Sequence, residues 1–304
     1  MPDWARRLIV SASIALGSIT LAACGSLALV PDAPIRCDDC DDWNQPQEPF
    51  LIYGNTYYVG VAGLSSILIN TSEGLILLDA GLPQSAGLIA ANIRKLGFDP
   101  RDIQVIAVSH AHFDHVGGIA ALQRLSEALV FTSVPTLWVM RRGTLAGDDP
   151  QFDPGNPTMS FPAVPGANAI DDGTAPTIGD VQIRGIYTPG HTPGGMTWTW
   201  QACEGGHCLD VVYADSLSPV SAPAFRFGSG ESGAGGQIHR SADIIAELDC
   251  DIFLAPHPFY FGIKEKLQQG RAAFIDDQGC RRYAASMLAR LQRRLTDERT
   301  NNRR

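Results

Sequence analysis

The sequence has little concentrated positive charge. Its formal net charge is −9 at pH 7, with 23 Lys and Arg residues against 32 Asp and Glu residues. Apart from the tail "ERTNNRR" at residues 298–304, which is typical of a solvated chain end, it has no basic run. A nucleic-acid partner would need a basic surface. The composition therefore argues against such a partner and indicates a globular protein.

The sequence also lacks a long apolar run near its start. The run at residues 8–23 is shorter than the roughly 20 residues that a membrane-spanning helix needs, and two arginines precede it. This pattern predicts a secretory signal peptide at residues 1–23. The end of the run, "LAAC", resembles the lipobox of bacterial lipoproteins and predicts lipidation of Cys24, with ordinary cleavage after small residues as the alternative. We expect a periplasmic protein, which is anchored to the outer membrane if Cys24 is lipidated.

Cysteine is scarce, with seven in 304 residues. In an oxidising compartment the six other than Cys24 can form three disulfides, although sequence does not fix their connectivity. Local spacing suggests Cys37 with Cys40, Cys203 with Cys208, and Cys250 with Cys280. A structural zinc site is the alternative for the first pair, but no second pair with ribbon spacing accompanies it.

Apolar runs alternate with turn signals from residue 49 onward. The runs "FLIYGNTYYVGV", "SSILIN" and "GLILLDAG" predict strands, and helical spacing in "SAGLIAANIRKLGF" and "GGIAALQRLSEALV" predicts helices around the strand "IQVIAVS". After a long Gly- and Pro-rich stretch at residues 141–168, a similar series ends in a helix from about Gly270 to Leu295. We expect one domain over residues 24–304 with two similar halves, sheets in the middle, helices outside, and a functional surface loop at the long stretch.

Histidine is scarce as well, yet three of the seven histidines lie in "VSHAHFDHVGG" at residues 108–118. This segment follows a predicted strand and precedes a predicted helix, where open α/β sheets place their sites. On an extended segment His110 and His112 point the same way, and the following turn directs Asp114 and His115 toward a second point. Imidazole and carboxylate groups suit zinc, so the spacing predicts two adjacent metals. The alternative, a solvated polar loop, is disfavoured by the apolar flanks.

Two further histidines follow predicted strands in the second half of the chain. His191 lies in "TPGHTPGG", and His257 lies in "FLAPHPF". With them, five histidines and one aspartate can supply three protein ligands to each of two metals. His207 and His239 lack this setting.

These residues carry a family resemblance. The His-x-His-x-Asp-His motif at residues 110–115, His191 in "GHTPG" and His257 in "PHP" resemble the metallo-β-lactamase superfamily. An aspartate rather than a cysteine at the second metal, and the segments at residues 43–61 and 213–227, resemble subclass B3. The resemblance covers roughly residues 40–290. It implies an α/β fold of the αββα type, with two central mixed β-sheets between outer helices.

The resemblance also implies roles for single residues. It assigns His110, His112 and His191 to a first Zn²⁺, and Asp114, His115 and His257 to a second. It places Asp79 beside the metals, where it fixes a histidine tautomer or the loop, with turn capping as the alternative. Ser216 and Ser218 are expected to hold the substrate carboxylate and Gln151 to contact substrate side groups, although each also has a purely structural alternative.

Asp215 is ambiguous, because related lactonases and thioesterases use an aspartate in this region as a bridge between the metals. In the subclass B3 pattern it does not bridge, and the resemblance then places Asp215, like Asp79, beside the metal ligands. The expected activity is hydrolysis of the β-lactam amide of penicillins, cephalosporins or carbapenems, by a zinc-bound hydroxide that Asp114 orients. A lactonase or thioesterase is the first alternative, and a non-enzymatic envelope lipoprotein with structural zinc is the second. We expect a monomer whose only membrane contact is a lipid anchor.

Overall fold

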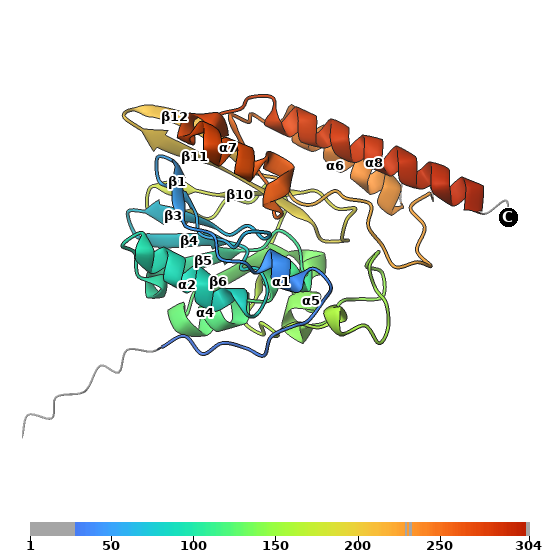
Figure 1. The fold of residues 1–304 in the computed structure, drawn as a ribbon, viewed down its shortest axis with the longest axis horizontal. Helices are drawn as coiled ribbons and strands as arrows, with labels where there is room; N and C mark the ends of the chain where they lie inside the picture. Colours follow the sequence, from blue (N-terminus) through green and yellow to red (C-terminus); the bar gives the residue numbers. More distant parts are fainter. Residues whose placement is uncertain (1–27, 229, 231–232, 302–304) are drawn as a thin grey trace, which may run out of the picture.

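The structure, a computed structural model, describes residues 28–228, 230 and 233–301. The predicted signal peptide and Cys24 lie outside these residues. Within them, two mixed β-sheets pack together, with helices on both outer sides (Figure 1). The predicted order of helices, sheet, sheet and helices is confirmed. In the described part of the chain, no helix is both long and apolar enough to cross a membrane.

The first sheet contains seven strands in chain order. They are β1 (Phe50–Tyr53), β2 (Thr56–Tyr58), β3 (Ile67–Thr71), β4 (Gly74–Leu78), β5 (Ile103–Ala107), β6 (Leu129–Ser133) and β7 (Asn168–Ile170). Strands β1 to β4 pair antiparallel, whereas longer crossovers make β4 to β7 parallel. The run "FLIYGNTYYVGV" therefore forms two strands, with a turn at Gly54, whose φ of 53° favours glycine.

The second sheet contains four strands. They are β10 (Arg184–Tyr187), β11 (Met196–Glu204), β12 (His207–Tyr213) and β13 (Ile252–Leu254), while β8 (Thr177–Ile178) and β9 (Val181–Gln182) form a separate ribbon. The first three strands are antiparallel, and β13 joins β12 in parallel. The two halves of the chain thus contribute sheets of unequal size.

Helices cover the outer face of each sheet (Figure 1). The α-helices are α1 (Cys40–Trp43), α2 (Ser85–Lys95), α3 (Phe113–Val116), α4 (Ile119–Ser126), α5 (Val134–Arg142), α6 (Ala234–Glu247), α7 (Ile263–Gln269) and α8 (Gly279–Asn301). Short 3-10 turns are η1 (Pro100–Asp102), η2 (Pro157–Met159), η3 (Pro258–Phe261) and η4 (Arg271–Phe274). The helix predicted from Gly270 is wrong at its start, because Gly270 has a φ of 93° and ends α7, and α8 begins only at Gly279.

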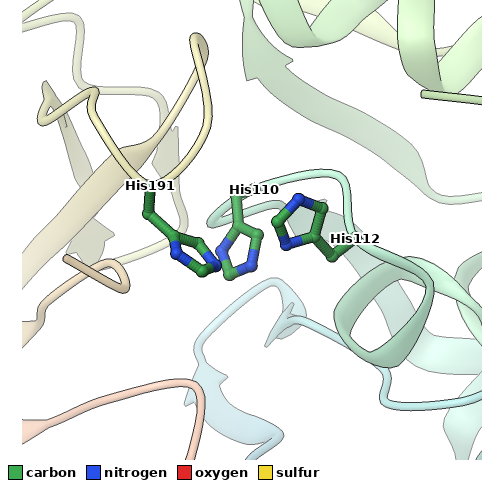
Figure 2. Close-up of side chains that lie close together, drawn as sticks. All are labelled: His110, His112 and His191. Atoms are coloured by element: carbon green, nitrogen blue, oxygen red, sulfur yellow. The ribbon is translucent and has the colours of Figure 1, made fainter. Parts of the chain in front are cut away.

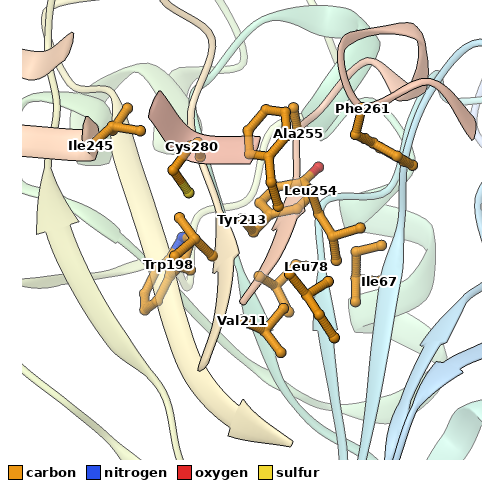
Figure 3. Packing of buried hydrophobic residues seen from close by; sticks show 14 of the residues in the cluster. Ile67, Leu78, Trp198, Val211, Tyr213, Ile245, Leu254, Ala255, Phe261 and Cys280 are labelled. Atoms are coloured by element: carbon orange, nitrogen blue, oxygen red, sulfur yellow. The ribbon is translucent and has the colours of Figure 1, made fainter. Parts of the chain in front are cut away.

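The main apolar core lies between the sheets and under α6 and α8. Ile67 and Leu78 of the first sheet pack in one cluster with Trp198 and Tyr213 of the second, and all four are fully buried (Figure 3). Burying one large apolar side chain contributes about 1.5–3 kcal/mol, so this cluster fixes the two sheets against each other. A second cluster fills the space between the first sheet and the helices α2, α4 and α5.

Three disulfides are present, joining Cys37 with Cys40, Cys203 with Cys208, and Cys250 with Cys280. These are the pairs that local spacing suggests. The third connects the segment before β13 to the first turn of α8, and both of its cysteines belong to the main core.

Candidate metal centre

The histidine segment leaves the carboxyl end of β5 and is held by the other sheet. The backbone oxygen of Val108 accepts a hydrogen bond from the Trp198 indole (2.9 Å), and the backbone oxygen of Ser109 accepts one from the Met196 amide (2.8 Å). Both donors belong to β11 of the second sheet, and Met196 is the first residue of that strand. The candidate site therefore lies where the two sheets meet.

The first group of ligands consists of His110, His112 and His191 (Figure 2). All three side chains are buried, and one possible ligand atom from each lies within 4.8 Å of the others. Their ring centroids are 4.8–4.9 Å apart. In Figure 2, His191 approaches from a loop separate from the one that carries the other two.

The second group consists of Asp114, His115 and His257, whose ligand atoms also lie within 4.8 Å of one another. Oδ2 of Asp114 is 3.3 Å from Nε2 of His115 and 3.5 Å from Nε2 of His257. The two groups are neighbours, because the rings of His110 and His115 are only 4.4 Å apart. The structure thus brings together all six residues predicted as metal ligands.

Hydrogen bonds fix which nitrogen of three histidines faces its group. Nδ1 of His191 donates to the backbone oxygen of Ser218 (2.8 Å), and Nδ1 of His257 donates to that of Gly63 (3.1 Å). Nδ1 of His110 lies 2.7 Å from Oδ1 of Asp215. Each contact leaves Nε2 for a metal, and Nε2 of His110 is a buried atom with no hydrogen-bond partner among the described residues. An orphaned ring nitrogen of this kind fits a metal ligand.

His112 is oriented by Asp149, a residue that the sequence interpretation missed. Its Nε2 lies 3.1 and 3.2 Å from the two carboxylate oxygens of Asp149, which leaves Nδ1 for the first group. The Gln151 side-chain nitrogen lies 3.3 Å from Nδ1 of His112 and 3.3 Å from Nε2 of His191. The available signal for Asp149 was its place two positions before Gln151, in the loop already expected to border the site.

Burial makes most of these histidines ready to bind a metal. It lowers the pKa of His191 to about 3 and that of His257 to about 4, and it lowers the pKa of His110 well below the ordinary value. Burial also acts to lower the pKa of His112, but the charge and hydrogen bond of Asp149 outweigh it and raise that pKa. Neutral imidazole is the form that coordinates metals.

The carboxylate of Asp114 is held in its charged form. Burial by itself would raise its pKa, but the charge and hydrogen bond of His115, together with the charges of His257 and His112, lower the pKa below its usual value. The Asp114 carboxylate and the histidine ring nitrogens together form a nitrogen and oxygen donor set of the kind that zinc prefers. The residues present therefore fit two adjacent metal ions.

Asp79 lies beside the centre but belongs to neither ligand group. Its carboxylate accepts hydrogen bonds from the Ser109 amide (2.9 Å), the Ser109 hydroxyl (2.6 Å) and the Tyr213 hydroxyl (2.8 Å). Burial raises its pKa, against the opposing effects of His115 and these hydrogen bonds. Asp79 thus holds the loop that precedes His110, rather than a histidine ring.

Asp215 also lies outside both ligand groups. One carboxylate oxygen contacts His110, and burial raises the pKa of Asp215 well above its usual value. Gly195 allows this placement, because an added Cβ there would fall 2.1 Å from Oδ2 of Asp215. The side chain therefore approaches the first group from behind a histidine, a position that does not bridge the two groups.

The two predicted substrate-binding serines are both buried, with 1% of Ser216 and 6% of Ser218 exposed. The hydroxyl of Ser218 lies 3.2 Å from Nδ1 of His191, so this residue borders the first group. Contact of either serine, or of Gln151, with a substrate stays a prediction.

Comparison with known proteins adds the family. The sequence model described as "Metallo-beta-lactamase superfamily" matches residues 59–257, a range that includes all six candidate ligands. Among curated sequences, an N-acyl homoserine lactonase of Bacillus thuringiensis is 30% identical over 171 residues, which cover 48% of this chain. The chain spans only 62% of that relative's length.

Solved structures match over more of the chain. MEM-A1, a subclass B3 metallo-beta-lactamase from a soil metagenome library, is 45% identical and superimposes with a TM-score of 0.81, covering 86% of this chain and all of its own. MIM-1 of Novosphingobium pentaromativorans, another metallo-beta-lactamase, is 37% identical with a TM-score of 0.80, covering 85% of this chain and 93% of its own.

Proposed function

This chain belongs to the metallo-β-lactamase superfamily of hydrolases, and we propose that it is a dinuclear zinc β-lactamase of the subclass B3 type. The observation that carries the proposal is the pair of adjacent ligand groups, three histidines in one and two histidines with Asp114 in the other. The subclass B3 structure MEM-A1 and the metallo-beta-lactamase MIM-1 match 86% and 85% of the chain, whereas the lactonase matches 48%. The proposed substrates are β-lactam antibiotics.

The two groups of side chains would hold the two metals as the sequence predicts. When bound, zinc supplies Lewis acidity, which polarises a carbonyl oxygen and lowers the pKa of water toward neutrality. The charged carboxylate of Asp114 accepts a hydrogen bond from the attacking water and orients it. Ser216 and Ser218 are proposed to bind the substrate carboxylate, and Gln151 is proposed to contact the substrate beside the first group.

A lactonase is the second candidate, favoured by the match to the N-acyl homoserine lactonase. That function would be expected to use Asp215 as a bridge between the metals. The contact between Asp215 and Nδ1 of His110 argues against this role, because it occupies one carboxylate oxygen on the side of the ring away from the free Nε2.

A comparison of hydrolysis rates on β-lactams and on a lactone tests the proposal. The purified protein, supplied with zinc, would be assayed on a chromogenic cephalosporin, a carbapenem and an N-acyl homoserine lactone. We expect efficient opening of the β-lactams and a lactone rate lower by a factor of at least about 100. A factor of this size corresponds to about 2.7 kcal/mol of transition-state stabilisation. Preferential opening of the lactone would overturn the proposal in favour of the second candidate.

We also propose that the protein acts in the bacterial periplasm. The three disulfides support this location, because such bonds persist in oxidising compartments. Cell fractionation of the full chain and of its Cys24→Ala variant tests both export and the lipid anchor. Recovery of both proteins from the cytoplasm would contradict the location, and recovery of both as free periplasmic proteins would contradict the anchor.

A further inference from the structure

A pocket of about 310 Å³ lies behind the histidine segment, outside the candidate metal centre. Three parts of the chain form most of its walls: α5, the loop at residues 144–149 and the turn at residues 192–194. Ala111 closes it on the side of the histidine segment. The volume is at the lower end of the range found for small-molecule sites.

The pocket is distinct from the metal centre, because none of the six candidate ligands lines it. Ala111 explains how the two sites share one segment. It lies between His110 and His112, and the backbone at His112 is extended, with φ of −93° and ψ of 150°. Alternate side chains of an extended segment point to opposite sides, so the histidines face the metal centre and Ala111 faces the pocket.

The lining determines what the pocket can bind. Apolar contact comes mainly from Trp138, Val139, Leu145 and two prolines. Trp138 is 61% exposed, and the Arg141 guanidinium lies 6.0 Å from the centre of its ring, so part of the ring remains available to a ligand. Arg142 adds a positive charge to the lining, and Asp148 and Asp149 add two carboxylates. With one cation and two carboxylates, the pocket favours an uncharged ring compound over an acid.

The walls also connect the pocket to the metal centre. Asp149 lines the pocket and holds Nε2 of His112 through its carboxylate. Thr192, in another wall, directly follows His191. A ligand that presses on either residue therefore acts on the orientation of a first-group histidine.

We propose that this pocket binds a small uncharged aromatic molecule with one hydrogen-bonding group, and that its occupancy changes the affinity of the metal centre. The binding part stands whether or not the chain hydrolyses β-lactams. The coupling part rests on the metal centre of the proposed function.

Fluorine NMR titration with 4-fluorobenzyl alcohol tests the binding part on the zinc-loaded protein. For a probe of this size we expect a Kd on the order of 1 mM, with weaker binding of 4-fluorobenzoate. Val139→Phe fills the pocket and should weaken binding at least about tenfold, whereas Val134→Phe, on the same helix but 54% exposed and outside the lining, should leave it unchanged.

Trp138→Ala is a second pocket variant that should not disturb folding, because it removes an exposed part of the wall and adds no volume to the core. This variant should also weaken binding. The binding part is overturned when the alcohol fails to bind the wild-type protein, when the benzoate binds more tightly, or when both pocket variants bind like wild type.

For the coupling part, the alcohol should bind with a Kd that differs at least about fivefold between zinc-loaded and chelated protein. Equal Kd values in the two states would overturn the coupling alone.

Discussion

Each candidate histidine ligand other than His115 has a neighbouring residue that selects which ring nitrogen faces its ligand group. His191 and His257 use backbone oxygens, which substitution does not remove. His110 and His112 use the carboxylates of Asp215 and Asp149, which can be tested directly. These two carboxylates therefore give the sharpest predictions for single residues.

Asp149→Ala should weaken binding of the first metal by about 10–100-fold, because His112 loses the partner that fixes its ring. Competition against a chromophoric chelator measures this affinity. Asp153→Ala, an exposed acidic residue in the same loop, is the matched control and should match wild type. Equal metal affinity in the Asp149→Ala protein would show that the carboxylate does not orient the ligand.

Asp215→Asn should weaken the first metal and leave the second in place, because Asp215 contacts only His110 among the candidate ligands. Elemental analysis after dialysis against a weak chelator gives the number of metals retained, which we expect to fall from two to one. Loss of both metals together would instead indicate a bridging aspartate, as in the lactonase alternative.

Sequence interpretation named the six candidate ligands and, through the resemblance, placed Asp215 near them, but it did not predict which histidine Asp215 contacts and it missed Asp149. His110, His112, Asp114 and His115 are close in sequence, so their spacing predicts a shared site. Asp149 lies 37 positions from His112 and Asp215 lies 105 positions from His110, and local spacing contains no information about such contacts. Chain folding brings these partners together, and only the structure shows it.

At the scale of single elements, apolar periodicity predicted most strands and the helices α2 and α4. It missed α5, although the signals for its start are present. Ser133 is the N-cap, with its hydroxyl accepting a hydrogen bond from the Thr136 amide (3.4 Å), and Pro135 lies in the first turn. The helix is short, which leaves few turns in which a period can show, and its two β-branched valines lower its helix propensity.

The disulfide between Cys250 and Cys280 should stabilise the fold more than the one between Cys203 and Cys208. Their sequence separations are 30 and 5 residues, which correspond to about 3.6 and 2 kcal/mol of loop-closure entropy. Denaturant unfolding of the two double Cys→Ala variants checks this difference. A larger loss of stability in the Cys203 and Cys208 variant would contradict it.

Lys266 in α7 should make stability depend on pH in a definite direction. Burial lowers its pKa, although Asp276 opposes the shift, so the charged form is disfavoured in the folded protein. Lys266→Met should therefore raise the melting temperature near pH 7 by roughly 2 °C. This gain should shrink as the pH rises and disappear above the unfolded pKa of about 10.4, where the lysine is neutral in both states.

Thermal unfolding across this pH range measures the effect, with Lys264→Met, an exposed residue of the same helix, as the control. A gain that grew with pH would have the wrong sign.

At the scale of the whole molecule, the site is assembled from strand ends in both sheets. Asp79 and His110 follow β4 and β5 of the first sheet, while His191 and His257 follow β10 and β13 of the second. The layered packing of the two sheets converts four distant strand ends into one centre. The family resemblance anticipated this arrangement, whereas strand periodicity alone does not say how two sheets pack.

The most direct test of the account follows metal content and β-lactam hydrolysis in the same sample. The zinc-loaded protein would be treated stepwise with a chelator and then given zinc again, while a chromogenic cephalosporin reports the rate. The account predicts two zinc ions per chain, a rate that falls as they are removed, and recovery when zinc returns. Undiminished hydrolysis by fully metal-free protein would contradict it.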